Sequence, residues 1–285
     1  MTPAFALALG AMGCFGVGDL IYKRAASAGA AAHRFMMIQS SCVGVLMLAY
    51  GLVTQALVPS AASLWGAVAG LFAYTGYYNF AKSLRTGNVS INAPVFRLSF
   101  TVTAALAVLL LGEPLNLPKV AGLGLALAAV WLLLGGEPGA PGTDPAQVRA
   151  SMLRVLGATA AVGVANLLYK VGLRAGATAA TMLLVQAATV IALGTYRSWR
   201  IDGGFPVRRV EMRYAASTGV VLTGAFVLLM EALARGQASV LVPIVQMGFV
   251  VTALAGFLFL GERFTARKGV GLAMAVGALG CLAVA

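Results

Sequence analysis

Residues 87–119 read GNVSINAPVFRLSFTVTAALAVLLLGEPLNLPK, and residues 236–268 read GQASVLVPIVQMGFVVTALAGFLFLGERFTARK. Both stretches contain a proline, then a Gly-Glu pair 18 residues further on (112 − 94 and 261 − 243), then a lysine. The second stretch lies 149 residues after the first (236 − 87). A match of this length and spacing indicates two copies of one unit within the chain.

The repetition extends toward the start of each copy. Tyr22-Lys23 returns as Tyr169-Lys170, 147 residues later (169 − 22). One small insertion accounts for the difference between the two offsets. We therefore predict a first repeat at residues 1–136, a linker at 137–150 and a second repeat at 151–285.

The composition indicates a membrane protein. The chain is 60% hydrophobic and 10% charged, with a mean hydropathy of +0.92. A soluble domain of this size cannot bury so much apolar surface, so we expect a lipid bilayer to surround it. The net charge of +12 raises the alternative of nucleic-acid binding. The basic residues lie in short loops between apolar runs and form no continuous face, which argues against that alternative.

Loop residues divide the chain into ten apolar segments, each near the roughly 20 residues that a membrane span needs. The stretches at 135–147 and 197–213 are too polar to span. We predict an all-α integral membrane protein, with about ten spans in two five-helix repeats around a central cavity. The expected spans are 4–22, 34–54, 62–82, 89–111, 117–135, 153–170, 178–196, 213–233, 238–260 and 267–284.

The orientation follows from the odd number of spans in each half. The second copy must enter the membrane from the opposite side, which makes the duplication an inverted repeat. One set of alternate loops holds fifteen Lys and Arg residues, and the other holds four. The positive-inside rule places the basic set in the cytoplasm and both termini outside, in a bacterial-type inner membrane.

The sequence contains no pattern typical of a cofactor site or an enzyme. The three cysteines have no paired spacing, and His33 is the only histidine, so we expect no disulfide framework and no metal centre. It contains no phosphate-binding loop of the Walker type. Because no catalytic constellation remains, we expect a protein that is not an enzyme and has no cofactor.

Arg97 is a charged residue well inside the fourth predicted span. Its repeat mate is Gln246 (246 − 97 = 149). An ionisable side chain at membrane depth usually faces a cavity or a partner. Arg97 is therefore a candidate for binding an anionic group such as a carboxylate, with Gln246 at the related position. The alternatives are a structural ion pair or a side chain that reaches the interface.

Pro94 and Pro243 precede this polar pair by three residues in each repeat. A proline inside a helix removes a backbone hydrogen bond and kinks the chain, so both are candidate kink or gating positions. Each could instead mark the first turn of its span, where proline is well tolerated.

Asp19 is an acidic residue that lies well inside an apolar run. Asn166 occupies the equivalent position in the second repeat (166 − 19 = 147). Both are candidate substrate-binding residues. Asp19 could carry a coupling proton or hold an amine. A local ion pair with Lys23, one helical turn further on, is the favoured alternative for Asp19.

The third predicted span contains the run Tyr74-Thr75-Gly76-Tyr77-Tyr78-Asn79-Phe80. Tyr74 and Tyr78 share a helix face and could form a wall for a flat ligand, with Asn79 beside them. An interfacial aromatic belt is the alternative, and Tyr77 fits that alternative best.

The repeated Pro, Gly-Glu and Lys elements resemble the signature of the EamA domain, and two such domains in tandem typify the drug/metabolite transporter superfamily. The resemblance covers almost the whole chain. It implies ten helices in two inverted repeats around a central cavity, working by alternating access. Bacterial members similar to this chain include exporters of amino acids, among them aromatic ones.

The leading interpretation is a monomeric inner-membrane secondary transporter. It would export amino acids, including aromatic or other hydrophobic ones, or similar small metabolites. One alternative is a multidrug efflux carrier that is proton-coupled through Asp19. Another is a non-transporting subunit that presents lipid-linked sugars to a partner.

Overall fold

The structure is a computed structural model that describes residues 2–86, 89–134, 145–259 and 265–285. These residues form twelve α-helices and one 3₁₀ turn, and no strand occurs among them. The elements in chain order are α1 (Pro3–Ser27), α2 (Ala32–Val53), η1 (Ala61–Leu64), α3 (Trp65–Thr86), α4 (Val89–Arg97), α5 (Ser99–Leu111), α6 (Leu117–Leu134), α7 (Pro145–Arg174), α8 (Ala179–Asp202), α9 (Arg209–Arg235), α10 (Ala238–Gln246), α11 (Gly248–Phe259) and α12 (Ala266–Ala283).

These helices form ten membrane segments, because α4/α5 and α10/α11 are each one segment with a break. Seven helical segments of the described chain are long and apolar enough to cross a membrane, and Val95–Leu111 and Leu117–Leu133 are shorter apolar helices. The prediction of an all-α membrane protein with about ten spans is confirmed.

The helices are longer than the apolar runs at two places. α8 continues to Asp202 and α9 begins at Arg209, so only residues 203–208 interrupt the stretch expected to be a basic loop at 197–213. α7 begins at Pro145, where a proline is tolerated in the first turn, so residues 145–150 of the expected linker are helical. Residues 137–144 of that linker lie outside the described residues. These helix ends can be polar because they project beyond the lipid, where water solvates their side chains.

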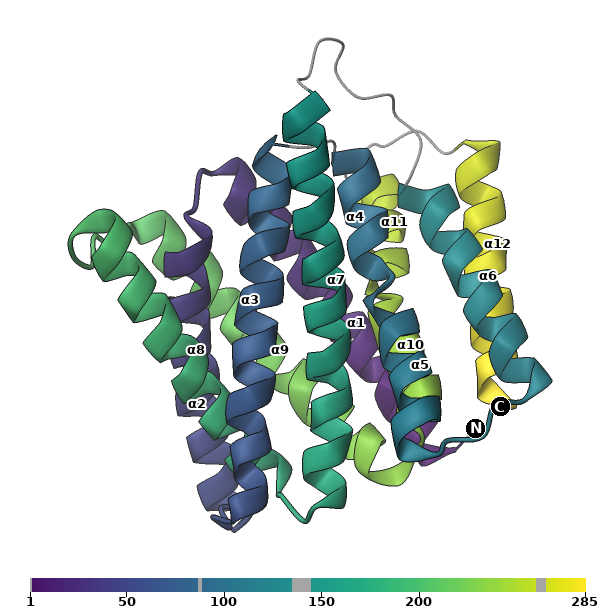
Figure 1. The fold of residues 1–285 in the computed structure, drawn as a ribbon, viewed down its shortest axis with the longest axis horizontal. Helices are drawn as coiled ribbons and strands as arrows, with labels where there is room; N and C mark the ends of the chain where they lie inside the picture. Colours follow the sequence, from purple (N-terminus) through teal and green to yellow (C-terminus); the bar gives the residue numbers. More distant parts are fainter. Residues whose placement is uncertain (1, 87–88, 135–144, 260–264) are drawn as a thin grey trace.

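The packing of the two halves follows a two-fold pattern (Figure 1). α3 packs on α7 as α1 packs on α9, and α5 packs on α7 as α11 packs on α1. The equivalent helices α2 and α8 pack on each other at one side, and α6 and α12 do so at the other. α1 begins at the end of the bundle that carries both termini, whereas α7 begins at the opposite end. The repeat is therefore inverted.

The same contact joins the halves at two equivalent places. The Thr103 hydroxyl on α5 donates to the carbonyl oxygen of Gly163 on α7, at 3.0 Å. The Thr252 hydroxyl on α11 donates to the carbonyl oxygen of Gly16 on α1, at 3.2 Å. A Cβ atom on either glycine would overlap a valine side chain of the partner helix. Glycine is therefore required at both crossings, because it lets the backbones approach closely.

Motifs that recur between the halves hold the junction between α9 and α10. The Glu113 carboxylate accepts hydrogen bonds from the backbone nitrogens of Ala238 and Ser239, both at 2.8 Å, at the start of α10. The Lys170 ammonium donates to the carbonyl oxygen of Gly236 at 2.6 Å, just after α9 ends. These contacts satisfy backbone groups that would otherwise lack partners at helix ends. Glu262, the repeat mate of Glu113, lies outside the described residues.

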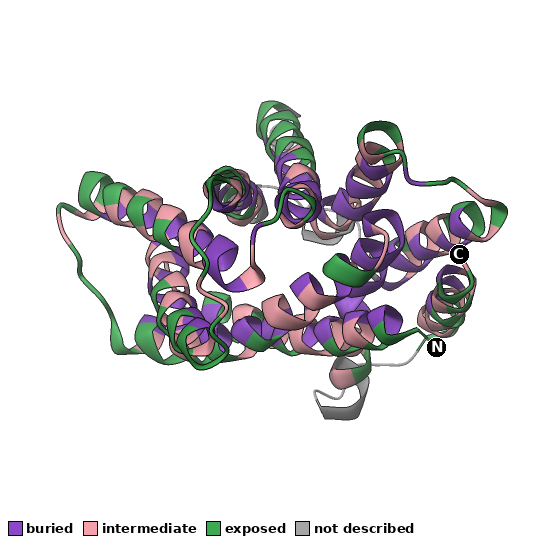
Figure 2. Cartoon of the chain, turned by 90° about the horizontal axis from the view of Figure 1, so that it is seen from below, coloured by how far each residue is buried: buried purple, intermediate pink, exposed green. Residues whose placement is uncertain are grey.

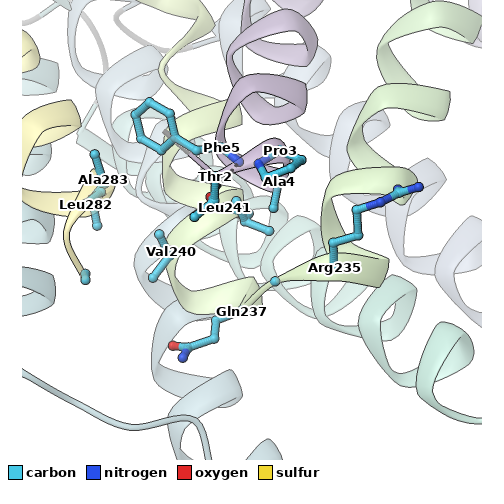
Figure 3. Close-up of a pocket in the computed structure, with 12 residues that line it drawn as sticks. Thr2, Pro3, Ala4, Phe5, Arg235, Gln237, Val240, Leu241, Leu282 and Ala283 are labelled. Carbon is cyan, nitrogen blue, oxygen red and sulfur yellow. Dashed lines mark hydrogen bonds between the residues drawn. The ribbon is translucent and has the colours of Figure 1, made fainter.

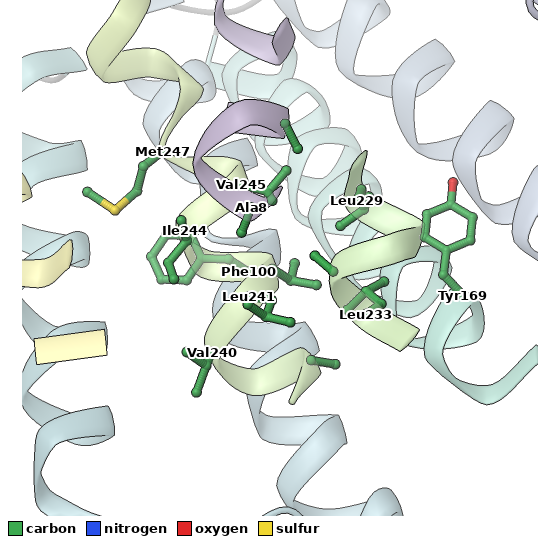
Figure 4. Close-up of a cluster of buried hydrophobic side chains, with 14 of the residues drawn as sticks. Ala8, Phe100, Tyr169, Leu229, Leu233, Val240, Leu241, Ile244, Val245 and Met247 are labelled. Atoms are coloured by element: carbon green, nitrogen blue, oxygen red, sulfur yellow. The ribbon is translucent and has the colours of Figure 1, made fainter. Parts of the chain in front are cut away.

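The apolar core surrounds α10, as Figure 4 shows. Phe100 of α5 packs in the same cluster as Leu241, Ile244 and Met247, and all four are buried. Figure 2, which views the bundle from the end with the termini, shows buried residues where helices face one another and exposed residues toward the outside. Many large hydrophobic side chains are among the exposed residues, including Leu109, Leu117 and Trp131, as expected where lipid is the solvent.

The end opposite the termini carries an ionic network. The Arg34 guanidinium contacts both carboxylates of the network, Glu211 at 2.7 Å and Asp202 at 2.8 Å, and His33 lies 2.7 Å from Asp202. Glu211 is fully buried and also accepts from the backbone nitrogens of Ala31 and Arg208. The network ties α2 to the ends of α8 and α9. It is called the basic-end network below.

Candidate functional site

Asp19 and Arg97 form an ion pair across the interior of the bundle. Asp19 lies on α1, and Arg97 is the last residue of α4, directly before the break with α5. The free carbonyl groups at the C-terminal end of a helix favour a cation there, which helps to place the guanidinium. The side chains keep 30% and 19% of their surface exposed. Both charges are therefore paired with each other and still accessible.

Tyr77 of α3 lies near this ion pair, and its ring packs against Phe96, the residue before Arg97, with ring centroids 5.6 Å apart. Its hydroxyl is within electrostatic range of both Asp19 and Arg97, and also of Tyr22 and Tyr169. Tyr77 is nevertheless 37% exposed. Its neighbours belong to α1, α4 and α7.

Two equivalent tyrosine–glutamine pairs flank Tyr77. In the first half the Tyr22 hydroxyl donates to Oε1 of Gln39, which joins α1 to α2. In the second half Tyr169 of α7 lies beside Gln186 of α8. None of these four residues was among the site candidates predicted from the sequence. The available signal was that both the tyrosines and the glutamines recur at an offset of 147 (169 − 22 and 186 − 39).

Asn166 lies one turn before Tyr169 on α7, and its side chain is buried. Its Nδ2 atom has no hydrogen-bond partner among the described residues, and neither does Oε1 of Gln186. Asn166 is the repeat equivalent of Asp19, and its position three residues before Tyr169 puts both side chains on one face of α7.

Tyr74 and Tyr78 lie on a different face of α3 from Tyr77. Their rings stack with centroids 5.9 Å apart and pack against Met36 and Val190. The Arg197 guanidinium covers the Tyr78 ring at 4.2 Å from its centroid. The structure does not bring this expected aromatic wall to Arg97.

Asn79, the third candidate on α3, turns back to its own helix. Its Nδ2 atom donates to the carbonyl oxygen of Thr75 at 2.8 Å. A side-chain amide bonded to the preceding turn is a local helix contact.

The two prolines lie just before the helix breaks. Pro243 is inside α10, beyond its first turn, and Pro94 holds the same position along the backbone of α4. The chain breaks at Met247 and at Leu98, where backbone nitrogens bond three residues back, to Ile244 at 3.1 Å and to Val95 at 3.1 Å. The interior position favours the kink over the first-turn alternative. Gln246, the last residue of α10, lies at the second break as Arg97 does at the first.

Two cavities occur at other places. One of about 330 Å³ lies at the end with the termini, between Phe5, Val240 and Leu282, with Arg235 and Gln237 at its edge (Figure 3). The other, of about 640 Å³, is lined by residues of α1 and by residues outside it, namely Val17, Leu20, Ile21, Lys23, Arg24, Ser27, Ala28, Tyr214 and Ala255. Neither is lined by Asp19 or Arg97. Among the described residues, no group of three or more His, Cys, Asp or Glu side chains could hold a metal ion.

Comparison with known proteins agrees with this architecture. A solved crystal structure superposes with a TM-score of 0.82 at 18% identity, covering 99% of this chain and 96% of the other. That likeness shows the fold. A search of curated proteins gives no match. The model of the EamA-like transporter family matches residues 2–135 and again residues 149–284. The chain therefore belongs to the EamA-like transporter family, with the tandem EamA architecture of the drug/metabolite transporter superfamily, and is a multi-pass membrane transporter of small molecules.

Proposed function

We propose that this protein exports α-amino acids across the bacterial inner membrane by alternating access, and that the zwitterionic backbone of the substrate binds between Asp19 and Arg97. The observation that carries the proposal is the partly exposed ion pair at the helix break. The guanidinium suits a carboxylate, which it can hold with two parallel hydrogen bonds. The Asp19 carboxylate suits an ammonium group.

An amino acid can enter this site without leaving a charge unpaired. The zwitterion replaces one internal ion pair by two ion pairs with the substrate. A cationic drug would pair with Asp19 and leave Arg97 uncompensated in a low-dielectric interior, which is costly. The ion pair thus argues for an amino acid over the proton-coupled multidrug alternative.

The broken helices supply the moving parts. Transporters commonly build their central sites from discontinuous helices at the interface between inverted repeats. Arg97 and Gln246 lie at the two breaks. A change at either break would therefore move a polar side chain of the site together with its half of the bundle.

Counterflow in proteoliposomes tests this proposal. Wild-type protein should exchange a labelled amino acid such as leucine or glutamine above the rate of empty liposomes. Arg97→Ala should lower exchange by at least about thirtyfold, since breaking a buried charge contact costs about 2 kcal/mol or more. The double variant Asp19→Arg/Arg97→Asp, which swaps the two charges, should recover part of the lost exchange rate.

Ser41→Ala is the matched control, because the Ser41 hydroxyl bonds only to the carbonyl of Met37 on its own exposed helix face. It should exchange at the wild-type rate. Absence of exchange for every amino acid would overturn the proposal. Wild-type exchange by Arg97→Ala would make the ion pair a structural contact. Drug sensitivity that rises with Asp19→Asn, without amino acid exchange, would favour the multidrug alternative.

A further inference from the structure

The larger of the two cavities, of about 640 Å³, runs along one face of α1. Residues of α1 and of its C-terminal cap line it at intervals of three or four, namely Val17, Leu20, Ile21, Arg24 and Ala28. This spacing puts them on one stripe of the helix. Tyr214 of α9 and Ala255 of α11 line it too, and both helices pack on α1. The cavity is therefore a groove along α1 with α9 and α11 beside it, called the α1 groove below.

The α1 groove lies on the side of α1 away from the proposed transport site. With 3.6 residues per turn, Asp19 and Tyr22 lie roughly opposite the stripe that lines the groove. Asp19 pairs with Arg97 in the interior of the bundle, and Tyr22 bonds to α2. Val17, at one end of the stripe, is 42% exposed. The groove is therefore open to the surrounding lipid.

The length of the α1 groove matches one leaflet of a bilayer. Val17 lies near the middle of α1, and Ala28 follows its last residue, at the end of the bundle opposite the termini (Figure 1). The 11 residues between them (28 − 17) rise about 16 Å along the helix axis. Half of a hydrocarbon core of about 30 Å is about 15 Å. The groove thus extends from the middle of the membrane to one interface.

The chemistry of the lining changes along this length. The deep part of the groove is apolar, with Val17, Leu20 and Ile21 along its base. The part nearest the interface carries the groove's cationic and hydroxyl side chains, which are Lys23, Arg24, Ser27 and Tyr214. None of the described residues that line the groove is acidic. The groove is therefore apolar at depth and basic at the interface.

We propose that the α1 groove binds one anionic phospholipid of the leaflet at the end opposite the termini. The lipid phosphate lies against Arg24 and Tyr214, and an acyl chain lies along Val17, Leu20 and Ile21. A soluble anion would use only the basic part of the groove, and a neutral oil only the apolar part. A phospholipid matches the depth, the order of apolar and basic parts, and the charge together. Binding at this site does not require that the protein exports amino acids.

The bound lipid contacts both repeats. α1 belongs to the first repeat, whereas α9 and α11 belong to the second. A ligand that lies between elements of the folded bundle stabilises the folded state in proportion to its occupancy. The affinity for the lipid can therefore be measured from the thermal midpoint of the purified protein.

Thermal unfolding in detergent, with increasing amounts of added lipid, tests the charge of the site. Dioleoyl-phosphatidylglycerol should raise the thermal midpoint more than dioleoyl-phosphatidylcholine does. Arg24→Gln should lower the affinity for phosphatidylglycerol about fivefold, because it removes one cation at an anionic headgroup. Arg213→Gln is the matched control, since Arg213 is an exposed cation next to Tyr214 that does not line the groove. It should bind the lipid as the wild-type protein does.

A second pair of variants tests the apolar part. Ala255→Phe adds bulk inside the groove and leaves every charge in place, so it should also lower the affinity for phosphatidylglycerol. Leu254, its neighbour on α11, is 42% exposed and does not line the groove. Leu254→Phe should therefore leave the affinity unchanged. The two pairs are independent, so a variant that fails to fold leaves the other pair to decide.

Three results would overturn the lipid site. Equal affinities for the two lipids would reduce it to a nonspecific apolar surface. Equal affinities for phosphatidylglycerol in Arg24→Gln and Arg213→Gln would assign the binding to the overall charge of this end. An equal rise of the midpoint with glycerol phosphate, which has the headgroup without the chains, would make it a site for a soluble anion. If the lipid binds as expected and no amino acid is exchanged, the lipid site holds and the proposed function fails.

Discussion

Several charged residues of this molecule anchor helix ends, and Glu211 is one of them. It is fully buried, and it is bonded to the Arg34 guanidinium and to two backbone nitrogens. Glu113 and Lys170 serve in the same way at the other end, where they hold backbone groups at helix termini. Asp19, Arg97 and Asn166 differ from these anchors, because each retains exposed or unpaired polar atoms. Anchoring and binding therefore fall to different residues.

Glu211→Gln should destabilise the protein. The substitution keeps the size of the side chain and removes the charge that compensates Arg34. Breaking a buried ion pair costs about 3 kcal/mol or more, on the order of 5–10 °C in the thermal midpoint. Thermal unfolding in detergent measures the shift. Ser217→Ala on the exposed face of α9 is the control, and an equal midpoint for both variants would mean that the basic-end network adds nothing to stability.

At the scale of elements, close helix crossings depend on glycine. A Cβ atom on Gly66 of α3 would overlap the carbonyl oxygen of Met182 on α8, and one on Gly70 would lie 3.0 Å from the carbonyl oxygen of Gln186. Such backbone atoms cannot move aside as a flexible side chain can. The crossing of α3 and α8 also sets the position of Gln186 beside Tyr169.

Gly66→Ala and Gly157→Ala should change stability in opposite directions. Gly66→Ala forces α3 away from α8 and should cost about 1–3 kcal/mol. Nothing lies within 4 Å of a Cβ on Gly157 in α7, so Gly157→Ala should gain up to about 1 kcal/mol from helix propensity. The difference between their thermal midpoints measures the effect. A Gly66→Ala midpoint at or above the wild-type value would contradict the packing described for α3 and α8.

The elements were largely predictable from the sequence, because lipid fixes the length of an apolar span and polar residues mark its ends. The polar residues within spans were predictable as well, which is why Arg97, Gln246, Asp19 and Asn166 were candidates. The contact between Asp19 and Arg97 was not predictable, because it joins spans far apart in the chain. The sequence was equally consistent with a local ion pair between Asp19 and Lys23. Helical periodicity likewise put Tyr74 and Tyr78 on one face without showing which helices that face meets.

At the scale of the whole molecule, the charges separate the two ends of the bundle. Lys119, Lys170, Arg174 and Arg235 belong to helix ends on the side of the termini. The described residues of the larger basic set lie toward the opposite end, where α8 and α9 meet. The positive-inside rule therefore predicts that the termini lie outside the cell and the basic end inside.

Cysteine labelling tests this orientation. Cys14, Cys42 and Cys281 are first replaced by serine, and a single cysteine is then introduced at Ser60 or at Gly204. A membrane-impermeant maleimide should label Ser60→Cys in intact cells, because Ser60 lies at the end with the termini. It should label Gly204→Cys only after the cells are permeabilised. The reverse pattern would invert the orientation and the expected direction of export.

The basic-end network also bears on the resting conformation. In an inverted repeat, the inward-open and outward-open states exchange the roles of the two halves, so perfect symmetry would make them equal in energy. The repeat equivalent of Arg34 is Thr181 (181 − 34 = 147), and its hydroxyl bonds to a backbone carbonyl, that of Val58. Ion pairs thus join α2, α8 and α9 at the basic end, whereas a neutral hydrogen bond occupies the equivalent position in the other half. Under the proposed alternating access, we expect this asymmetry to favour the state in which the basic end is closed.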